Sequence, residues 1–225
     1  MPDRSTAFLF DLDGTLVDSV YQHVLAWREA LDAEGIALSV WRIHRKVGMS
    51  GGLLTNLLLR ETGVALDPER IERLQRRHAQ AYRKHVDEVR PLPGARALLD
   101  ALTAAEIPWA IATSGRLETA GPVLSKLEID IDRVPVITRD QVRHAKPDPD
   151  LFLAAADRIG ADAQDATVVG DAVWDMLAAR RARALGIGLL SGGYGQEELE
   201  RAGAYRVFAD PRDLLDHLDE VGGRR

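Results

Sequence analysis

The sequence predicts an α/β protein in which a parallel sheet carries helices on both faces and an all-helical segment is inserted near the start. Three observations support this prediction. The chain begins with a short apolar run, Ala7 to Phe10, which is typical of a buried strand. From Ser19 to about Arg90 the apolar residues recur only at helical spacing. After Gly94, strand-like and helix-like stretches alternate, which is typical of parallel strands joined by helical crossovers.

The inserted segment is expected to hold successive helices with no strand between them. The first helix is marked by apolar residues at helical spacing, Val20, Val24, Trp27 and Leu31. Gly35 favours the end of this helix. The next two are predicted at residues 40–47 and 52–61. The last is predicted at residues 68–89, with Asp67 as its N-cap and Pro68 in its first turn. The stretch Arg90-Pro91-Leu92-Pro93-Gly94 predicts a turn that closes the segment.

The remaining elements are assigned from short apolar runs and from the helical patterns between them. Strands are predicted at residues 109–112, 134–137, 167–169 and 187–189, and a last strand-helix pair at residues 205–218. Helices are predicted at residues 95–105, from 117, at 150–159 and at 173–184. The first strand is expected to join this sheet.

Composition excludes several classes of protein. The 225 residues are 46% hydrophobic and 28% charged, and 29 basic against 35 acidic side chains give a net charge of -6, which argues against a general nucleic-acid binder. The sequence has no Cys, so disulfides, thiolate ligands and Cys nucleophiles are ruled out. It also shows neither an apolar run near the ~20 residues of a membrane span nor a signal-peptide pattern. We therefore expect a cytoplasmic protein that binds neither nucleic acid nor membranes.

Polar residues follow several of the predicted strands at the point where each strand ends. Asp11 and Asp13 follow the first strand, Thr113 and Ser114 the second, and Asp171 a later one. Ligands of parallel α/β sheets bind beyond the carboxyl ends of the strands, so these side chains are expected to meet. A loop rich in Pro adds a cation, and the helix after Asp171 adds another acid. The candidate site residues are Asp11, Asp13, Thr113, Ser114, Lys146, Asp171 and Asp175.

The chemistry of this set indicates phosphoryl transfer. Carboxylates this close repel one another unless a cation lies between them, and oxygen-only ligands favour Mg²⁺. Lys146 and the Thr113 hydroxyl suit an incoming phosphate. Asp11 is a candidate nucleophile that would give an aspartyl-phosphate. Asp13, two residues on, is placed to protonate the leaving alcohol and later to deprotonate the attacking water.

The sequence resembles the haloacid dehalogenase superfamily of phosphohydrolases, in its phosphoglycolate phosphatase and β-phosphoglucomutase branch. The four motifs of that superfamily stand in order as Asp11-Leu12-Asp13-Gly14-Thr15, Thr113, Lys146 before Pro147, and Gly170-Asp171-Ala172-Val173-Trp174-Asp175. The resemblance implies a Rossmann-like catalytic core from residues 1–18 and 91–225, and a small helical cap from residues 19–90.

The resemblance also implies a role for each candidate residue. Asp11 would be nucleophile and metal ligand, and Asp13 would be acid/base with its backbone carbonyl on the metal. Thr113, Ser114 and Lys146 would hold phosphate. Asp171 would bind Mg²⁺, and Asp175 would do so directly or through water. The expected activity is hydrolysis of a small phosphorylated metabolite.

Single residues discriminate between this activity and alternative functions within and beyond the superfamily. Dehalogenases lack an acid at the position of Asp13, and phosphonatases need a cap Lys for which the sequence offers no convincing candidate. A sugar phosphomutase is the main alternative, but the Arg that β-phosphoglucomutases carry in the cap is Gly51 here, and their Glu in the fourth motif is Gly170. A non-catalytic phosphate-accepting module is a third hypothesis. His23 is expected to pack within its helix rather than to act as acid or base.

Overall fold

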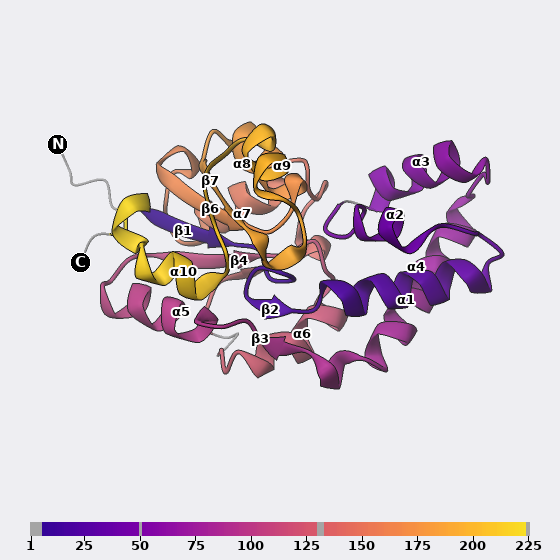
Figure 1. Cartoon of the computed structure of the whole chain (residues 1–225), viewed down its shortest axis with the longest axis horizontal. Coiled ribbons are helices and arrows are strands. Elements are labelled where there is room, and N and C mark those ends of the chain that lie inside the picture. The colour runs from indigo at the N-terminus through magenta and orange to yellow at the C-terminus, as the bar shows by residue number, and fades with distance from the viewer. Residues whose placement is uncertain (1–5, 50, 130–132, 224–225) are drawn as a thin grey trace.

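The computed structural model describes residues 6–49, 51–129 and 133–223. Figure 1 shows a sheet with flanking helices and, beside it, a group of helices formed by the segment after β2. Within the described residues, no helix combines the length and the apolar character needed to cross a membrane.

Six parallel strands form the main sheet in the order β5-β4-β1-β6-β7-β8. Strand β1 lies between β4 and β6, so that Phe8 pairs with Trp109 on one side and with Thr167 on the other. The strands span β1 Ala7–Phe10, β4 Trp109–Ala112, β5 Val136–Ile137, β6 Ala166–Gly170, β7 Leu185–Leu189 and β8 Ala204–Phe208. The predicted α/β class with a parallel sheet is confirmed.

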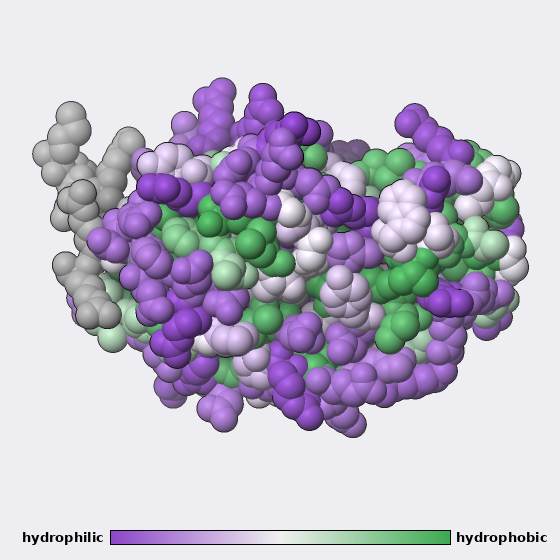
Figure 2. All heavy atoms as spheres, viewed as in Figure 1, coloured by the Kyte–Doolittle hydropathy of each residue, from purple (hydrophilic) through white to green (hydrophobic). Residues whose placement is uncertain are grey.

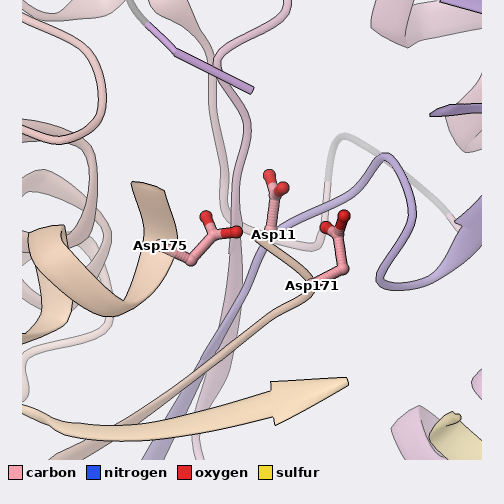
Figure 3. A group of neighbouring side chains, drawn as sticks. All are labelled: Asp11, Asp171 and Asp175. Atoms are coloured by element: carbon pink, nitrogen blue, oxygen red, sulfur yellow. The ribbon is translucent and has the colours of Figure 1, made fainter. Parts of the chain in front are cut away.

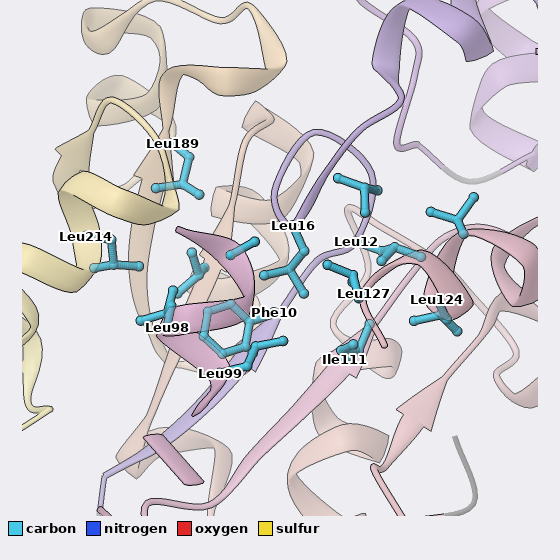
Figure 4. Packing of buried hydrophobic residues seen from close by; sticks show 14 of the residues in the cluster. Phe10, Leu12, Leu16, Leu98, Leu99, Ile111, Leu124, Leu127, Leu189 and Leu214 are labelled. Atoms are coloured by element: carbon cyan, nitrogen blue, oxygen red, sulfur yellow. The ribbon is translucent and has the colours of Figure 1, made fainter. Parts of the chain in front are cut away.

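Alternation of side chains along β1 divides the core into two layers. Phe8 and Phe10 point to one face, where they join a cluster with residues of α5, α6 and α10, part of which is drawn in Figure 4. Ala7 and Leu9 point to the other face and pack against α7 and α8. The helices of this part span α5 Ala95–Ala104, α6 Leu117–Lys126, α7 Asp150–Arg158, α8 Val173–Ala182, α9 Gln196–Ala202 and α10 Pro211–Asp216.

Residues 19–90, called the cap below, hold the helices α1 Val20–Ala33, α2 Val40–His44, α3 Gly51–Thr62 and α4 Pro68–Arg83. Their inner faces form an apolar cluster separate from the two layers of the sheet, with Val24, Ile43 and Leu74 among its buried members. The predicted N-cap of α4 is present, since the side chain of Asp67 accepts a hydrogen bond from the Arg70 amide at 2.7 Å. The base of the cap is not independent of the core, because Ala26, Ala81 and Tyr82 belong to the cluster around Phe10.

Two short strands connect the cap to the core. Neither was predicted from the sequence. Strand β2, Val17–Asp18, pairs antiparallel with β3, Arg90–Pro91, so both crossings into the cap lie side by side. The turn predicted for residues 90–94 is therefore a strand in its first two residues. A two-residue ladder is fixed by a partner more than 70 residues away, and local sequence carries no signal for it.

Three further assignments need correction. Helix α4 ends at Arg83 instead of continuing to Val89, and a separate 3₁₀ turn follows at Val86–Glu88. Helix α2 ends at His44 instead of Val47. Helix α9 was missed, because its seven residues bury only Leu199 and so present no apolar stripe.

Candidate active site

Three carboxylates converge beyond the carboxyl ends of β1 and β6. Asp11 follows β1 directly, Asp171 follows β6, and Asp175 lies in the first turn of α8. All three are buried, and each offers an oxygen within 4.8 Å of the others. Figure 3 shows them directed toward one shared space. Adjacent parallel strands end at the same edge, so the pairing of β1 with β6 brings these residues together.

Glycines around this triad let the carboxylates approach. A Cβ at Gly14 would lie 2.6 Å from Asp171 Oδ2, and a Cβ at Gly192 only 1.7 Å from the same oxygen. Gly14 also has φ +80°, a conformation that favours glycine. At Gly170 a Cβ would lie 2.3 Å from the Cβ of Asp175. These positions have no room for a side chain while the triad keeps its geometry.

Burial and the crowding of negative charge raise the pKa of two carboxyl groups of the triad, Asp11 and Asp171. Burial raises the pKa of Asp11 to about 7, with Asp175 adding to the rise and Lys146 opposing it. Burial also raises the pKa of Asp171 well above its ordinary range, and the charges of Asp175 and Asp11 add to that effect. The triad therefore lacks positive charge, which is the condition that a bound divalent cation would relieve.

Lys146 is the cation that the structure places beside the triad. Its side chain is fully buried, and its ammonium group pairs with Asp11 and, at 2.9 Å, with Asp175 Oδ1. Burial lowers the pKa of Lys146, but the two carboxylates outweigh that effect and the net shift is upward, so the group stays charged. One ammonium group cannot balance three ionised carboxylates, so full ionisation of the triad requires further positive charge.

The donor set of the triad fits a hard divalent cation. All the converging atoms are carboxylate oxygens, which suits Mg²⁺ better than metals that prefer nitrogen or sulfur. Asp175 differs from its two neighbours, because its Oδ2 accepts from the Ala172 amide at 3.0 Å while its Oδ1 faces Lys146. Asp171 accepts a bond from Thr15 Oγ1 at 3.0 Å through Oδ1 only.

The carboxyl group of Asp13 lies outside the triad. Its Oδ1 accepts a hydrogen bond from Ser19 Oγ at 2.6 Å and lies 3.2 Å from His23 Nε2. Burial opposes ionisation of Asp13, but His23 and Ser19 outweigh it and lower the pKa of this carboxyl below its ordinary value. The side chain is thus held as a carboxylate next to Asp11, without sharing the triad's space.

Two hydroxyl groups lie at the end of β4. Thr113 is buried, and its Oγ1 accepts a bond from the Gly115 amide at 2.9 Å, which leaves its own proton for another acceptor. The buried hydroxyl oxygen of Ser114 has no hydrogen-bond partner in the described part of the chain. Both residues line the same cleft as Asp11 and Asp13, so both offer donors to an anion bound there.

The cleft lies between the cap and the core and has a volume of about 840 Å³. Asp11, Asp13 and Asp171 form part of its core side, whereas Asp175 and Lys146 lie behind them and do not line it. The cap contributes apolar and polar residues to the opposite side, among them Trp27, Met49, Leu54, Gln75 and Arg76.

Part of the site comes from the cap helices and was not predicted from the sequence. His23 does stack on Tyr82, at 3.9 Å between ring centroids, but it also contacts Asp13, so the expectation of packing alone was incomplete. His78 of α4 lines the cleft as well and lies 3.1 Å from His23. A contact between residues 55 positions apart could not be read from the sequence. The position of His23, one helical turn after Ser19, was the sequence signal that could have indicated its contact with Asp13.

A family model for haloacid dehalogenase-like hydrolases matches residues 6–183. Among curated proteins, N-acetylmuramic acid 6-phosphate phosphatase of Pseudomonas aeruginosa is 28% identical over 97% of this chain and 96% of its own length. Phosphoglycolate phosphatase of Agrobacterium fabrum is 34% identical over 82% of this chain and 80% of its own length.

Solved structures are also similar to this chain. A hydrolase from Pseudomonas syringae is 59% identical and superposes with a TM-score of 0.94 over 96% of this chain and 99% of that one. A β-phosphoglucomutase from Clostridium difficile is 23% identical with a TM-score of 0.82, over 96% of each chain, a likeness that concerns the fold alone.

Proposed function

This chain belongs to the haloacid dehalogenase-like hydrolase family, and from that premise we propose that it is a Mg²⁺-dependent phosphatase that hydrolyses a small phosphorylated metabolite through an aspartyl-phosphate on Asp11. The observation that carries the proposal is the position of Asp11. It lies in a buried carboxylate triad against Lys146, and it lines the cleft together with Asp13, Thr113 and Ser114.

In the first step a carboxylate oxygen of Asp11 attacks the phosphorus, and the bond between phosphorus and the ester oxygen breaks. The leaving alkoxide takes a proton from Asp13. The pKa of Asp13 is lowered in this structure, but a phosphate dianion bound beside it raises that pKa, so Asp13 takes up a proton from solvent when the substrate binds. Thr113 and Ser114 donate to the phosphate oxygens.

In the second step water attacks the phosphorus of the aspartyl-phosphate. Asp13, now a carboxylate again, takes a proton from that water. The bond between phosphorus and Asp11 breaks, which releases inorganic phosphate and restores the Asp11 carboxylate. Asp13 is then in the acid form that it had with substrate bound, and it gives this proton to solvent when phosphate leaves, so every side chain returns to its starting form.

Asp11 and Asp171 are the proposed side-chain ligands of Mg²⁺, and the backbone carbonyl of Asp13 is a further one. Asp175, with both oxygens engaged by Ala172 and Lys146, is proposed to act through water. When bound, the ion supplies the positive charge that offsets repulsion between Asp11 and the phosphate dianion. Lys146, which does not line the cleft, adds a fixed charge beside Asp11.

Residues 19–90 are proposed to act as a cap that closes over the cleft and excludes bulk water, with residues 17–19 as the hinge. This division of the chain into cap and core is supported by the separate apolar cluster of the cap and by the adjacent strands β2 and β3.

A sugar phosphomutase is the weaker alternative. The Glu that β-phosphoglucomutases carry at position 170 has no space here, because even a Cβ would lie 2.3 Å from Asp175. The curated relatives described above are phosphatases by name. Incubation with a hexose 1-phosphate separates the two activities, because a hydrolase releases inorganic phosphate without forming the 6-phosphate isomer.

A panel of phosphate monoesters tests the proposal directly. We expect inorganic phosphate to be released from at least one of phosphoglycolate, hexose phosphates, hexitol phosphates and N-acetylmuramic acid 6-phosphate. EDTA should abolish the release and excess Mg²⁺ should restore it. Asp11→Asn should reduce the release to background, and a variant as active as the wild type would contradict the proposed mechanism. Turnover beyond one phosphate per chain would also exclude a non-catalytic phosphate-accepting module.

A further inference from the structure

Both hydrogen bonds to the carboxyl group of Asp13 come from the cap side of β2 and meet at one oxygen. Ser19 Oγ and His23 Nε2 lie 2.6 and 3.2 Å from Oδ1. No partner of Oδ2 is found within the described residues. The carboxyl group is thus fixed at one oxygen and free at the other, which is the arrangement that a proton-transferring group needs, since the free oxygen must reach the substrate.

His23 is itself held from the other side by the fourth helix of the cap. Its Nδ1 lies 3.1 Å from Nε2 of His78, so Asp13, His23 and His78 form a continuous chain of hydrogen bonds from the core to α4. Asp13 as a carboxylate can only accept, so Nε2 of His23 carries a proton toward it. The remaining ring nitrogen of His23 then depends on His78 as its partner.

The ring of His78 has little freedom to leave this position. It stacks against Trp27 at 4.2 Å between centroids, and His23 lies against both His78, at 5.2 Å, and Tyr82, at 3.9 Å. Burial lowers the pKa of His78 well below its ordinary value, and the neighbouring His23 adds to that shift. A buried neutral imidazole keeps one donor and one acceptor, which is what the chain requires.

We propose that His78 is a positioning residue for the reaction: it fixes the ring of His23, which in turn fixes the carboxyl group of Asp13 with Oδ2 toward the leaving group. Because Ser19 and His23 lie on α1 or its N-cap and His78 on α4, Asp13 is correctly placed only while both helices are packed against the core. The inference rests on the proposed phosphatase function for its kinetic consequence, but the hydrogen-bond chain itself can be measured without any activity.

The kinetic test compares two substitutions of similar size. His78→Leu keeps an apolar side chain in the stack and removes both ring nitrogens. His78→Gln places an amide nitrogen as many bonds from Cα as Nε2 and offers a donor and an acceptor, so it serves whichever ring carries the proton. We expect His78→Leu to lower kcat by about 10-fold or more through misplacement of Asp13, with KM changed little. His78→Gln should retain most of the wild-type kcat, and both variants should unfold near the wild-type temperature.

His85→Leu is the matched control, because it makes the same exchange at a His of the cap that pairs with exposed Glu88 and does not line the cleft. It should leave kcat unchanged. If His78→Leu and His78→Gln lose kcat equally, or if KM changes and kcat does not, the positioning role is wrong and His78 serves only packing or substrate contact.

A second readout is independent of turnover. The ring ¹⁵N signals of His23, recorded by NMR, should shift in both Asp13→Asn and His78→Leu if the chain connects these residues, and should stay near the wild-type values in His78→Gln. An unchanged His23 signal in His78→Leu would overturn the inference. Absence of phosphate release from the wild type would instead contradict the proposed function, and the NMR result would still decide whether the chain exists.

Discussion

Asp171 reaches its position beside Asp11 and Asp175 because residues 14 and 192 have no side chain. Gly192 belongs to the loop after β7 and presses against Asp171, and Ser191 of the same loop donates to the Gly14 carbonyl at 2.6 Å. The proposed metal ligands are therefore held by backbone packing from two loops. These glycines are therefore as necessary to the geometry of the site as the carboxylates.

Gly192→Ala should weaken the binding of Mg²⁺. A Cβ at this position would lie 1.7 Å from Asp171 Oδ2, so the carboxylate or the loop has to move. Disturbing the surroundings of a metal ligand typically costs about 10- to 100-fold in affinity. Titration of the phosphatase activity with Mg²⁺ should show this as a higher half-saturating concentration.

Gly121→Ala is the control for that substitution. Gly121 lies inside α6, and no atom lies within 4 Å of an added Cβ. Replacing a helical Gly by Ala at an open position should stabilise the protein by roughly 0.5–1 kcal/mol and leave the Mg²⁺ titration unchanged. An equal half-saturating concentration for the wild type and Gly192→Ala would contradict the account of the glycines.

Glu34 connects two elements of the cap. It follows α1, and its carboxylate lies 3.0 Å from Arg77, 3.4 Å from Arg70 and 3.5 Å from Arg73, all on α4. Its backbone carbonyl also accepts from Arg70 at 2.6 Å. Slight burial raises the pKa of Glu34, but Arg77 and Arg73 outweigh it and the net pKa is lowered from 4.5. The pairing of α1 with α4 therefore includes an electrostatic contribution that depends on pH.

Glu34→Gln should destabilise the protein at neutral pH and have less effect in acid. A carboxyl whose pKa is lower in the folded state stabilises fully above its unfolded value of 4.5, and the stabilisation is lost as the pH falls through the folded value. Urea unfolding of wild type and variant at several pH values from about 7 down to about 3 measures the difference.

Glu197→Gln serves as the comparison, because Glu197 pairs with Arg201 on the exposed side of α9. It should change stability little at any pH, as exposed ion pairs do. If instead the free energies of unfolding of wild type and Glu34→Gln differ by the same amount at every pH down to about 3, the carboxylate charge contributes nothing to the α1–α4 contact.

Elements were predictable where the signal was local. Strand β1, strand β4 and the start of α4 lie at their predicted residues, because an apolar run or an N-cap marks each of them. The two-residue pair β2 and β3 and the polar helix α9 were not predictable, since their stability comes from packing with distant segments. For the same reason the convergence of Asp11 and Asp171 could be expected from strand ends, whereas the pairing of His23 with His78 could not.

In the whole molecule, the cap also contacts the core through α2 and the turn that follows it. The carbonyl of Arg45 accepts from Trp174 Nε1 and from Tyr194 Oη, each at 3.2 Å, and its guanidinium pairs with Glu198. His44 Nε2 donates to the Gly192 carbonyl at 2.7 Å. This contact joins the turn after α2 to the loop after β7, which packs against Asp171. Figure 2 shows hydrophilic residues over much of the visible face of the molecule, with hydrophobic patches between them.

Trp174→Phe should favour opening of the proposed cap. The substitution keeps an aromatic ring and removes one hydrogen bond to the cap, which contributes about 0.5–1.5 kcal/mol. We expect kcat/KM to fall by about 2- to 10-fold, since about 1.4 kcal/mol corresponds to tenfold. Trp41→Phe is the control, because Trp41 is an exposed residue of the cap whose ring lies beside Arg42 of the same helix. Equal kcat/KM values for wild type and Trp174→Phe would contradict a role of this contact in closure.

The central claim is that Asp11 is the group that accepts the phosphoryl group. The most direct test is acid quenching of the enzyme during turnover, followed by intact mass measurement and peptide mapping. We expect one added phosphoryl group in the wild type, located on the peptide that contains Asp11, and none in Asp11→Asn. A phosphoryl group on another residue, or an adduct that persists in Asp11→Asn, would contradict it.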